Sequence, residues 1–119
     1  MREDKYMDKQ KEKRIAVALE RITWWQAGLQ LVPCLPVVRE QLQRLLTALS
    51  AEIVLAPNRE TIRAMITATK HDLYKKTANT KELTDEQKEY FGKEIDLITD
   101  GIEHGIEGIL FIDWSNLQK

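Results

Sequence analysis

The chain has 119 residues, of which 43% are hydrophobic and 31% are charged, and its formal net charge is −1. This balance is typical of a globular protein with one modest core, and the five glycines and three prolines are too few for a turn-rich β fold. Cys34 is the only cysteine, which excludes an internal disulfide and a cysteine-based zinc site. The charged start (MREDKYMDKQKEKR) and the interrupted apolar stretch that follows predict neither a signal peptide nor a membrane helix. We therefore predict a cytoplasmic protein.

The charges are distributed unevenly along the chain. Residues 1–81 contain fifteen Lys and Arg against nine Asp and Glu, a net charge of +6, whereas residues 82–119 contain three against ten, a net charge of −7. Two interpretations follow. Either the two parts attract each other, within the fold or across a dimer, or the basic part meets an acidic partner.

Apolar residues are spaced as on a helix along most of the chain, and the first predicted helix runs from about Tyr6 to Leu31. Its main stripe consists of Ile15, Leu19, Ile22 and Leu29, with Ala18 and Trp25 at the edge. A second stripe on the opposite side repeats every seven residues and consists of Val17, Trp24 and Leu31. A helix that is apolar on two sides is either central or buries its second side in a partner. The turns within residues 1–13 are almost entirely charged, and we expect them to fray.

Prolines divide the next two predicted helices. Pro33 and Pro36 end the first helix and start the second, whose stripe is Leu35, Val38, Leu42, Leu45 and Leu49. Pro57 then breaks the chain, and Asn58 is a predicted N-cap. The third stripe that follows consists of Ile62, Met65, Ile66, Thr69 and Leu73.

The last predicted helix runs from Asp85 to about Leu110. The segment TDEQ at residues 84–87 fits a capping box, and the stripe after it consists of Phe91, Ile95, Ile98, Ile102, Ile106 and Ile109. Residues 111–119 form a short C-terminal tail, in which Trp114 and Leu117 could fold back as a lid. Four helices with short connections predict a single all-α domain over residues 1–119, an up-and-down four-helix bundle.

The stretch DLITDGIEHGIEGIL, residues 96–110, combines three kinds of residue on one helix. On a helical wheel its carboxylates lie opposite the isoleucines, so we expect them to face water: Asp96, Asp100, Glu103 and Glu107. Three glycines occupy a third sector: Gly101, Gly105 and Gly108. Each costs about 1 kcal/mol relative to alanine inside a helix. They predict either close packing of a neighbouring helix or a break of the helix near Gly101 and Gly105.

The sequence favours no catalytic or metal site. A carboxylate–histidine metal site around Asp100 and His104 is a minor alternative, because Glu-x-x-His pairs are absent and the carboxylates point away from the predicted core. His71 is expected to be solvated, and Cys34, without a nearby base, to be a buried structural thiol. Phosphate-binding loops, GxSxG and HExxH are also absent. We predict a protein that is not an enzyme and needs no cofactor.

Two surfaces could carry a function. Val17, Trp24 and Leu31 form either a partner-binding or homodimer face, or Trp24 fills a second internal groove. A basic region offers an alternative, nucleic-acid-binding surface: Lys70, Tyr74, Lys75, Lys76 and Lys81.

The predicted function is therefore that of a small, non-catalytic protein-interaction module, such as an adaptor, an inhibitor or immunity protein, or an accessory factor. We expect it to bind a protein partner or a second copy of itself through the aromatic–aliphatic face, with the acidic last helix supplying charge complementarity. The alternative is a nucleic-acid-associated regulator that uses the Lys70–Lys81 region.

Overall fold

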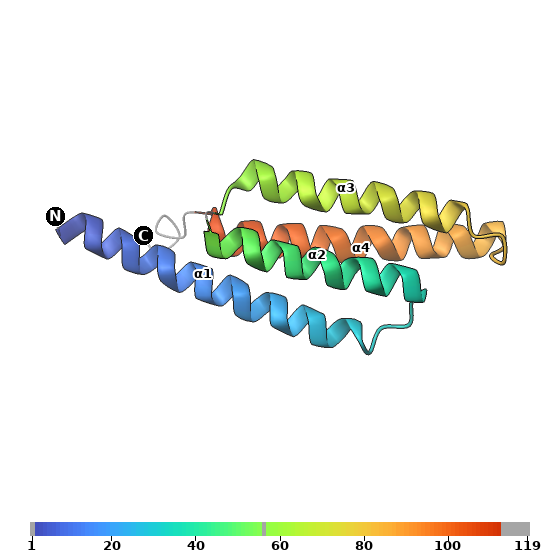
Figure 1. The fold of residues 1–119 in the computed structure, drawn as a ribbon, viewed down its shortest axis with the longest axis horizontal. Helices are drawn as coiled ribbons and strands as arrows, with labels where there is room; N and C mark the ends of the chain where they lie inside the picture. The colour runs from blue at the N-terminus through green and yellow to red at the C-terminus, as the bar shows by residue number, and fades with distance from the viewer. Residues whose placement is uncertain (1, 56, 113–119) are drawn as a thin grey trace.

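The computed structural model describes the backbone of residues 2–55 and 57–112 and the side chains of residues 9–55 and 57–112. This part of the chain forms four helices: α1 (Arg2–Leu29), α2 (Pro36–Leu55), α3 (Arg59–Ala78) and α4 (Asp85–Leu110). Consecutive helices run antiparallel, and α4 returns beside α1, so each helix packs against two neighbours (Figure 1). The predicted all-α, up-and-down four-helix bundle is confirmed. Trp114 and Leu117, the predicted lid, lie outside the described residues.

The first helix differs from its predicted bounds at both ends. It already begins at Arg2, so the charged turns that we expected to fray are helical, and it projects past the ends of α2 and α4 (Figure 1). It ends at Leu29, two residues early. Arg39 of α2 explains this end, because its guanidinium donates hydrogen bonds to the carbonyl oxygens of Leu29 and Val32, at 3.0 and 2.8 Å. Helix-terminal carbonyls need such donors, and here a neighbouring helix supplies them.

Side-chain caps begin α3 and α4, as the sequence predicts. The Asn58 side chain accepts a hydrogen bond from the backbone N–H of Thr61 at 2.9 Å. At α4 the capping box is complete, because the N–H of Gln87 donates to the Thr84 hydroxyl and the N–H of Thr84 donates to the Gln87 side chain. The helix that follows continues through the three glycines to Leu110, so the alternative of a break does not hold.

The core lies along the axis of the bundle and is built from the predicted stripes. Among the described residues, the buried polar side chains are those of Thr77 and Thr99, and the Thr99 hydroxyl donates a hydrogen bond to the carbonyl oxygen of Ile95 at 2.7 Å. The largest apolar side chains that are fully buried come from all four helices: Ile22, Leu42, Leu46, Leu49, Ile53, Ile62, Leu73, Ile95 and Ile106. Trp25 is half-buried and packs against this core. The core therefore fixes which side of each helix remains outside.

Candidate functional site

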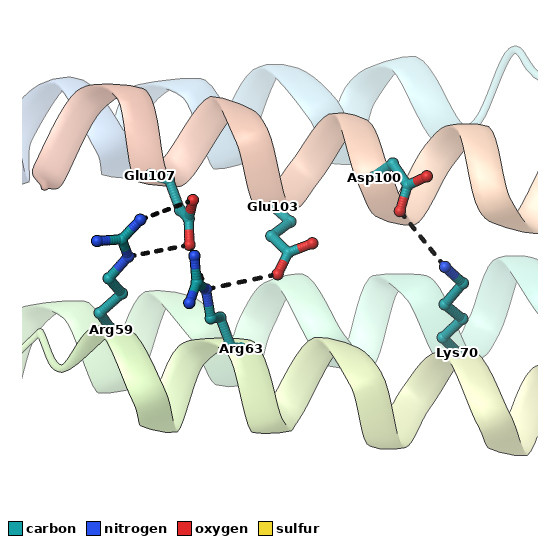
Figure 2. A network of polar contacts seen from close by, with 6 residues as sticks. All are labelled: Arg59, Arg63, Lys70, Asp100, Glu103 and Glu107. Carbon is teal, nitrogen blue, oxygen red and sulfur yellow. Dashed lines mark hydrogen bonds and ion pairs between the residues drawn. The ribbon is translucent and has the colours of Figure 1, made fainter. Parts of the chain in front are cut away.

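Four acidic residues of α4 lie within ion-pair distance of α3 and form an acidic row: Asp96, Asp100, Glu103 and Glu107. The Glu107 carboxylate makes the closest of these contacts (Figure 2). The Glu107 carboxylate accepts hydrogen bonds from the guanidinium groups of both Arg59, at 3.2 Å, and Arg63. Arg63 also lies 3.8 Å from the Glu103 carboxylate. Only 13% of the Glu107 side chain is exposed, against 49% for Arg59 and 48% for Arg63. The two arginines therefore cover this carboxylate from the solvent side.

The same arrangement continues along the two helices. The ammonium group of Lys70 lies 3.4 Å from carboxylate oxygens of both Asp96 and Asp100. The expectation that this acidic row faces water was right only in part: the side chains of Asp96 and Asp100 are 46% and 51% exposed, but the row also lies at ion-pair distance from basic residues of α3. A helical wheel correctly places the row away from the isoleucines, but that sector borders α3, which presents basic residues at matching intervals. The opposite charges of the two parts of the chain thus meet within the fold.

The ion pairs shift the proton affinity of Glu107. Hydrogen bonds from Arg59 and Arg63 favour the carboxylate form and lower the pKa of Glu107 from 4.5 to about 2. The hydrogen bond with Glu107 correspondingly raises the pKa of Arg63. Glu107 is therefore charged throughout the neutral range, as an ion-pair partner and not as a general acid.

The basic region predicted as a nucleic-acid surface is divided in the structure. Lys70 belongs to the contacts with α4, and Lys76 lies 3.2 Å from Asp72 on its own helix. Tyr74 is half-buried against the core. Lys75 and Lys81 remain exposed. The five residues therefore do not form one free cationic surface.

The histidines and the cysteine are scattered. His104 lies on the α1 side of α4, away from the acidic row, and His71 is exposed, with its ring 6.3 Å from that of Tyr74. Cys34 is only half-buried, in the connection between α1 and α2. Within the described ranges, no group of three or more His, Cys, Asp or Glu side chains could hold a metal ion.

The second apolar side of α1 is exposed along its length. The exposed fraction is 47% for Val17, 65% for Trp24 and 86% for Leu31. The alternative in which Trp24 fills an internal groove is therefore wrong, and only its neighbour Trp25 turns inward. The two adjacent indoles point in different directions because consecutive residues are separated by about 100° on a helix.

An apolar hollow between α1 and α4 lies beside Trp24. It has a volume of about 330 Å³ and is lined by Trp24, Trp25, Gly28, Leu29, Val32, Leu46, Leu97, Ile98, Gly101 and Ile102. Across the hollow from α1, the side chain of Leu97 is 68% exposed. Leu97 was not predicted as a site residue, although its position outside the isoleucine stripe of α4 was a usable signal. Trp24 and Leu97 form the two exposed edges of this hollow.

The glycines of α4 beside this hollow differ in what surrounds them. At Gly105 an added Cβ would lie 2.7 Å from the ring atoms Cη2 and Cζ2 of Trp25, so the indole occupies the space of the missing side chain. At Gly101, as at Gly28 on α1, a Cβ would meet nothing within 4 Å. The prediction of close helix packing at Gly101 is therefore wrong, because this glycine faces the hollow. For Gly108, which lines the next hollow along the helices, close packing stays a prediction.

That second hollow, of about 450 Å³, continues the first toward the N-terminal part of α1. It is lined by Lys13, Arg14, Val17, Arg21, His104, Gly105, Gly108 and Ile109. Arg21 connects the two hollows, because its guanidinium carbon lies 5.2 Å from the centroid of the Trp24 ring. We call the two hollows together the α1/α4 groove. One half is apolar and the other half is rimmed by basic side chains.

Comparison of the chain with protein-family models, curated proteins and solved structures gave no match. None of the helices in the described ranges is long and apolar enough to cross a membrane.

Proposed function

We propose that this chain is a cytoplasmic, non-catalytic protein-interaction module that binds its partner through the face around the α1/α4 groove. The observation that carries this proposal is the exposure of Trp24 at the edge of an apolar hollow. Tryptophan dominates interface hot spots, and an exposed apolar patch beside a hollow is typical of a binding surface. Val17 and Leu31 extend the patch along α1, and Leu97 extends it onto α4.

The charge layout modifies the predicted binding mechanism. We expected the acidic α4 to supply charge complementarity, but its carboxylate row is paired with α3. Apolar burial around Trp24 therefore carries the proposed contact, and self-association is its simplest form. The nucleic-acid alternative has less support, because Lys70 and Lys76 are both ion-paired.

Site-specific photo-crosslinking tests the proposed face. A photoreactive phenylalanine analogue would replace Trp24 or Leu97 in the source cell, and Leu55 in a control. Leu55 is a suitable control because it is 82% exposed but lies at the C-terminal end of α2. We expect one defined cross-linked protein, or a covalent dimer, from positions 24 and 97 and not from position 55. Equal labelling from all three positions, or none, would count against the proposal.

Light scattering on the purified protein gives a second test. If the chain self-associates, Trp24→Ala should lower its mass toward that of the monomer and leave its helical circular dichroism unchanged. Leu55→Ala, which shortens a still more exposed apolar side chain, should leave the mass unchanged.

A further inference from the structure

The basic half of the α1/α4 groove distinguishes it from an ordinary apolar patch. Lys13, Arg14 and Arg21 of α1 and His104 of α4 surround one hollow. Among the residues that the structure describes, the ion pairs lie within α2, within α3, within α4 or between α3 and α4, and none includes a residue of α1. Within the described ranges, the cations of this hollow therefore have no carboxylate partner, in contrast to the arginines of α3.

The two halves of the groove are contiguous along both helices. Arg21 lies about one turn before Trp24 on α1, and Gly101 lies one turn before Gly105 on α4. An occupant lying along the groove would thus meet the apolar hollow first and the cationic hollow one or two turns later. The open space beside Gly28 and Gly101 leaves room for its side chains in the apolar half.

We propose that the α1/α4 groove binds an acidic amphipathic helix of a partner protein. Helices dock into grooves by inserting apolar residues spaced three and four apart, which here would enter between Trp24 and Leu97. Carboxylates one or two turns along that helix would then reach the guanidinium groups of Arg14 and Arg21, which bind carboxylates in a bidentate geometry. This inference rests on the proposed function and specifies the chemistry of the partner.

Charge complementarity favours such a partner over a second copy of the chain. The acidic row of this chain, on α4, is held against Arg59, Arg63 and Lys70, so a second copy could present it only by breaking those ion pairs. A nucleic acid would satisfy the cations but not the apolar half, whose lining includes the aliphatic side chains Leu29, Val32, Leu46 and Leu97.

A peptide-display selection tests the proposal. The probe is a library of 20-residue helices with leucine fixed at apolar positions three and four apart, and with Glu, Lys or Gln at the flanking positions. We expect selection on the whole protein to enrich Glu over Lys at least tenfold. For a selected acidic peptide, Trp24→Ala should abolish binding, and the double variant Arg14→Glu, Arg21→Glu should weaken it at least tenfold.

The matched control reverses two charges elsewhere. Lys75→Glu, Lys81→Glu makes the same change in net charge at two exposed positions, one in the last turn of α3 and one in the connection between α3 and α4, and should change the affinity less than twofold. The proposal is overturned if Lys or Gln is enriched instead, if the control weakens binding as much as the groove variant, or if no peptide binds. It is also overturned if a single-stranded 20-mer DNA binds the groove and Trp24→Ala does not affect it.

The outcomes separate this inference from the proposed function. Peptides that depend on Trp24 but show no preference for Glu would remove the acidic partner and leave the interaction module. Failure of the peptides together with absence of cross-linking from positions 24 and 97 would remove both.

Discussion

Helix α4 packs against α3 on one side and α1 on the other, and the two contacts differ in kind. Toward α3 it presents carboxylates, which basic residues of α3 meet at ion-pair distance (Figure 2). Toward α1 it presents glycines, of which Gly105 receives the Trp25 ring and Gly101 faces open space. The contact between α3 and α4 is therefore lined by ion pairs. The contact between α1 and α4 combines a tight contact at the Trp25 ring with an open groove.

The difference indicates which side of α4 is free to bind a partner. Charges that are paired within the fold would have to be released before they could meet a partner. The α1 side has cations without carboxylate partners among the described residues, and exposed apolar side chains at Trp24 and Leu97. Four experiments test this difference between the two sides of α4.

The largest effect is expected from Trp25→Ala. Removal of a packed tryptophan leaves a cavity, and we expect the free energy of unfolding to fall by about 3 kcal/mol. The control is the adjacent Trp24→Ala, which should stay within about 0.5 kcal/mol of the wild type because most of that ring is already in water. Urea denaturation followed by circular dichroism measures both. Equal losses would mean that the two indoles are not divided between core and surface.

The two glycines beside the groove should respond in opposite directions to alanine. Gly101→Ala should stabilise the protein by about 1 kcal/mol, because alanine favours the helix and its Cβ meets nothing. Gly105→Ala gains the same propensity but forces the Trp25 ring to move, and overpacking of this kind costs about 1–3 kcal/mol. We expect the two variants to differ by about 2 kcal/mol in unfolding free energy. Two equally stabilised variants would show that the ring has room to shift.

On the α3 side, Glu107→Gln removes the charge that joins two arginines. Because these arginines are half-exposed, we expect a loss of about 1 kcal/mol at pH 7 and low salt. Glu40→Gln is the control, since its ion pair with Arg44 lies on the exposed surface of α2 and should contribute almost nothing. The difference between the two variants should shrink in high salt, where exposed charges are screened. Identical stabilities of both variants would contradict a special role for Glu107.

The smallest effect is the pH dependence of the same carboxylate. Its pKa is depressed in the folded state, so its contribution is fully present above the unfolded value of 4.5 and is lost as the pH falls toward about 2. The stability difference between the wild type and Glu107→Gln should therefore be nearly constant from pH 7 to 5, shrink as the pH falls through about 2, and vanish below that pH. A difference that stays constant across this range would show that the difference does not depend on the charge of Glu107.

The helices were predictable because their signals are local. Asn58 and Thr84 cap the helices that they were predicted to cap, and the isoleucine stripe of α4 lies in the core. The periodicity of a single helix identifies its buried side but not its neighbours. For this reason the acidic row, correctly placed away from the isoleucines, was assigned to water alone, although it also faces α3.

The candidate site was predictable only in part. Val17, Trp24 and Leu31 stand out by their seven-residue spacing, but their exposure depends on where the other helices lie. Leu97 and the basic hollow belong to the site only because α4 packs beside α1. The sequence of α1 alone does not show which helix is its neighbour. The packing role of the glycines depends on where one ring points, as Gly105 and Gly101 show.

The order of the helices has a kinetic consequence. In the described part of the chain, three helix contacts join consecutive helices, and the contact between α1 and α4 joins the first helix to the last. Consecutive hairpins close short loops, whereas the α1/α4 contact closes the longest loop and carries the largest entropic cost. A ligand that spans the α1/α4 groove would hold this closure in place and raise the stability of the whole bundle, by an amount that grows with the logarithm of the ligand concentration above its Kd. Occupation of the groove should therefore be measurable as slower unfolding of the whole bundle.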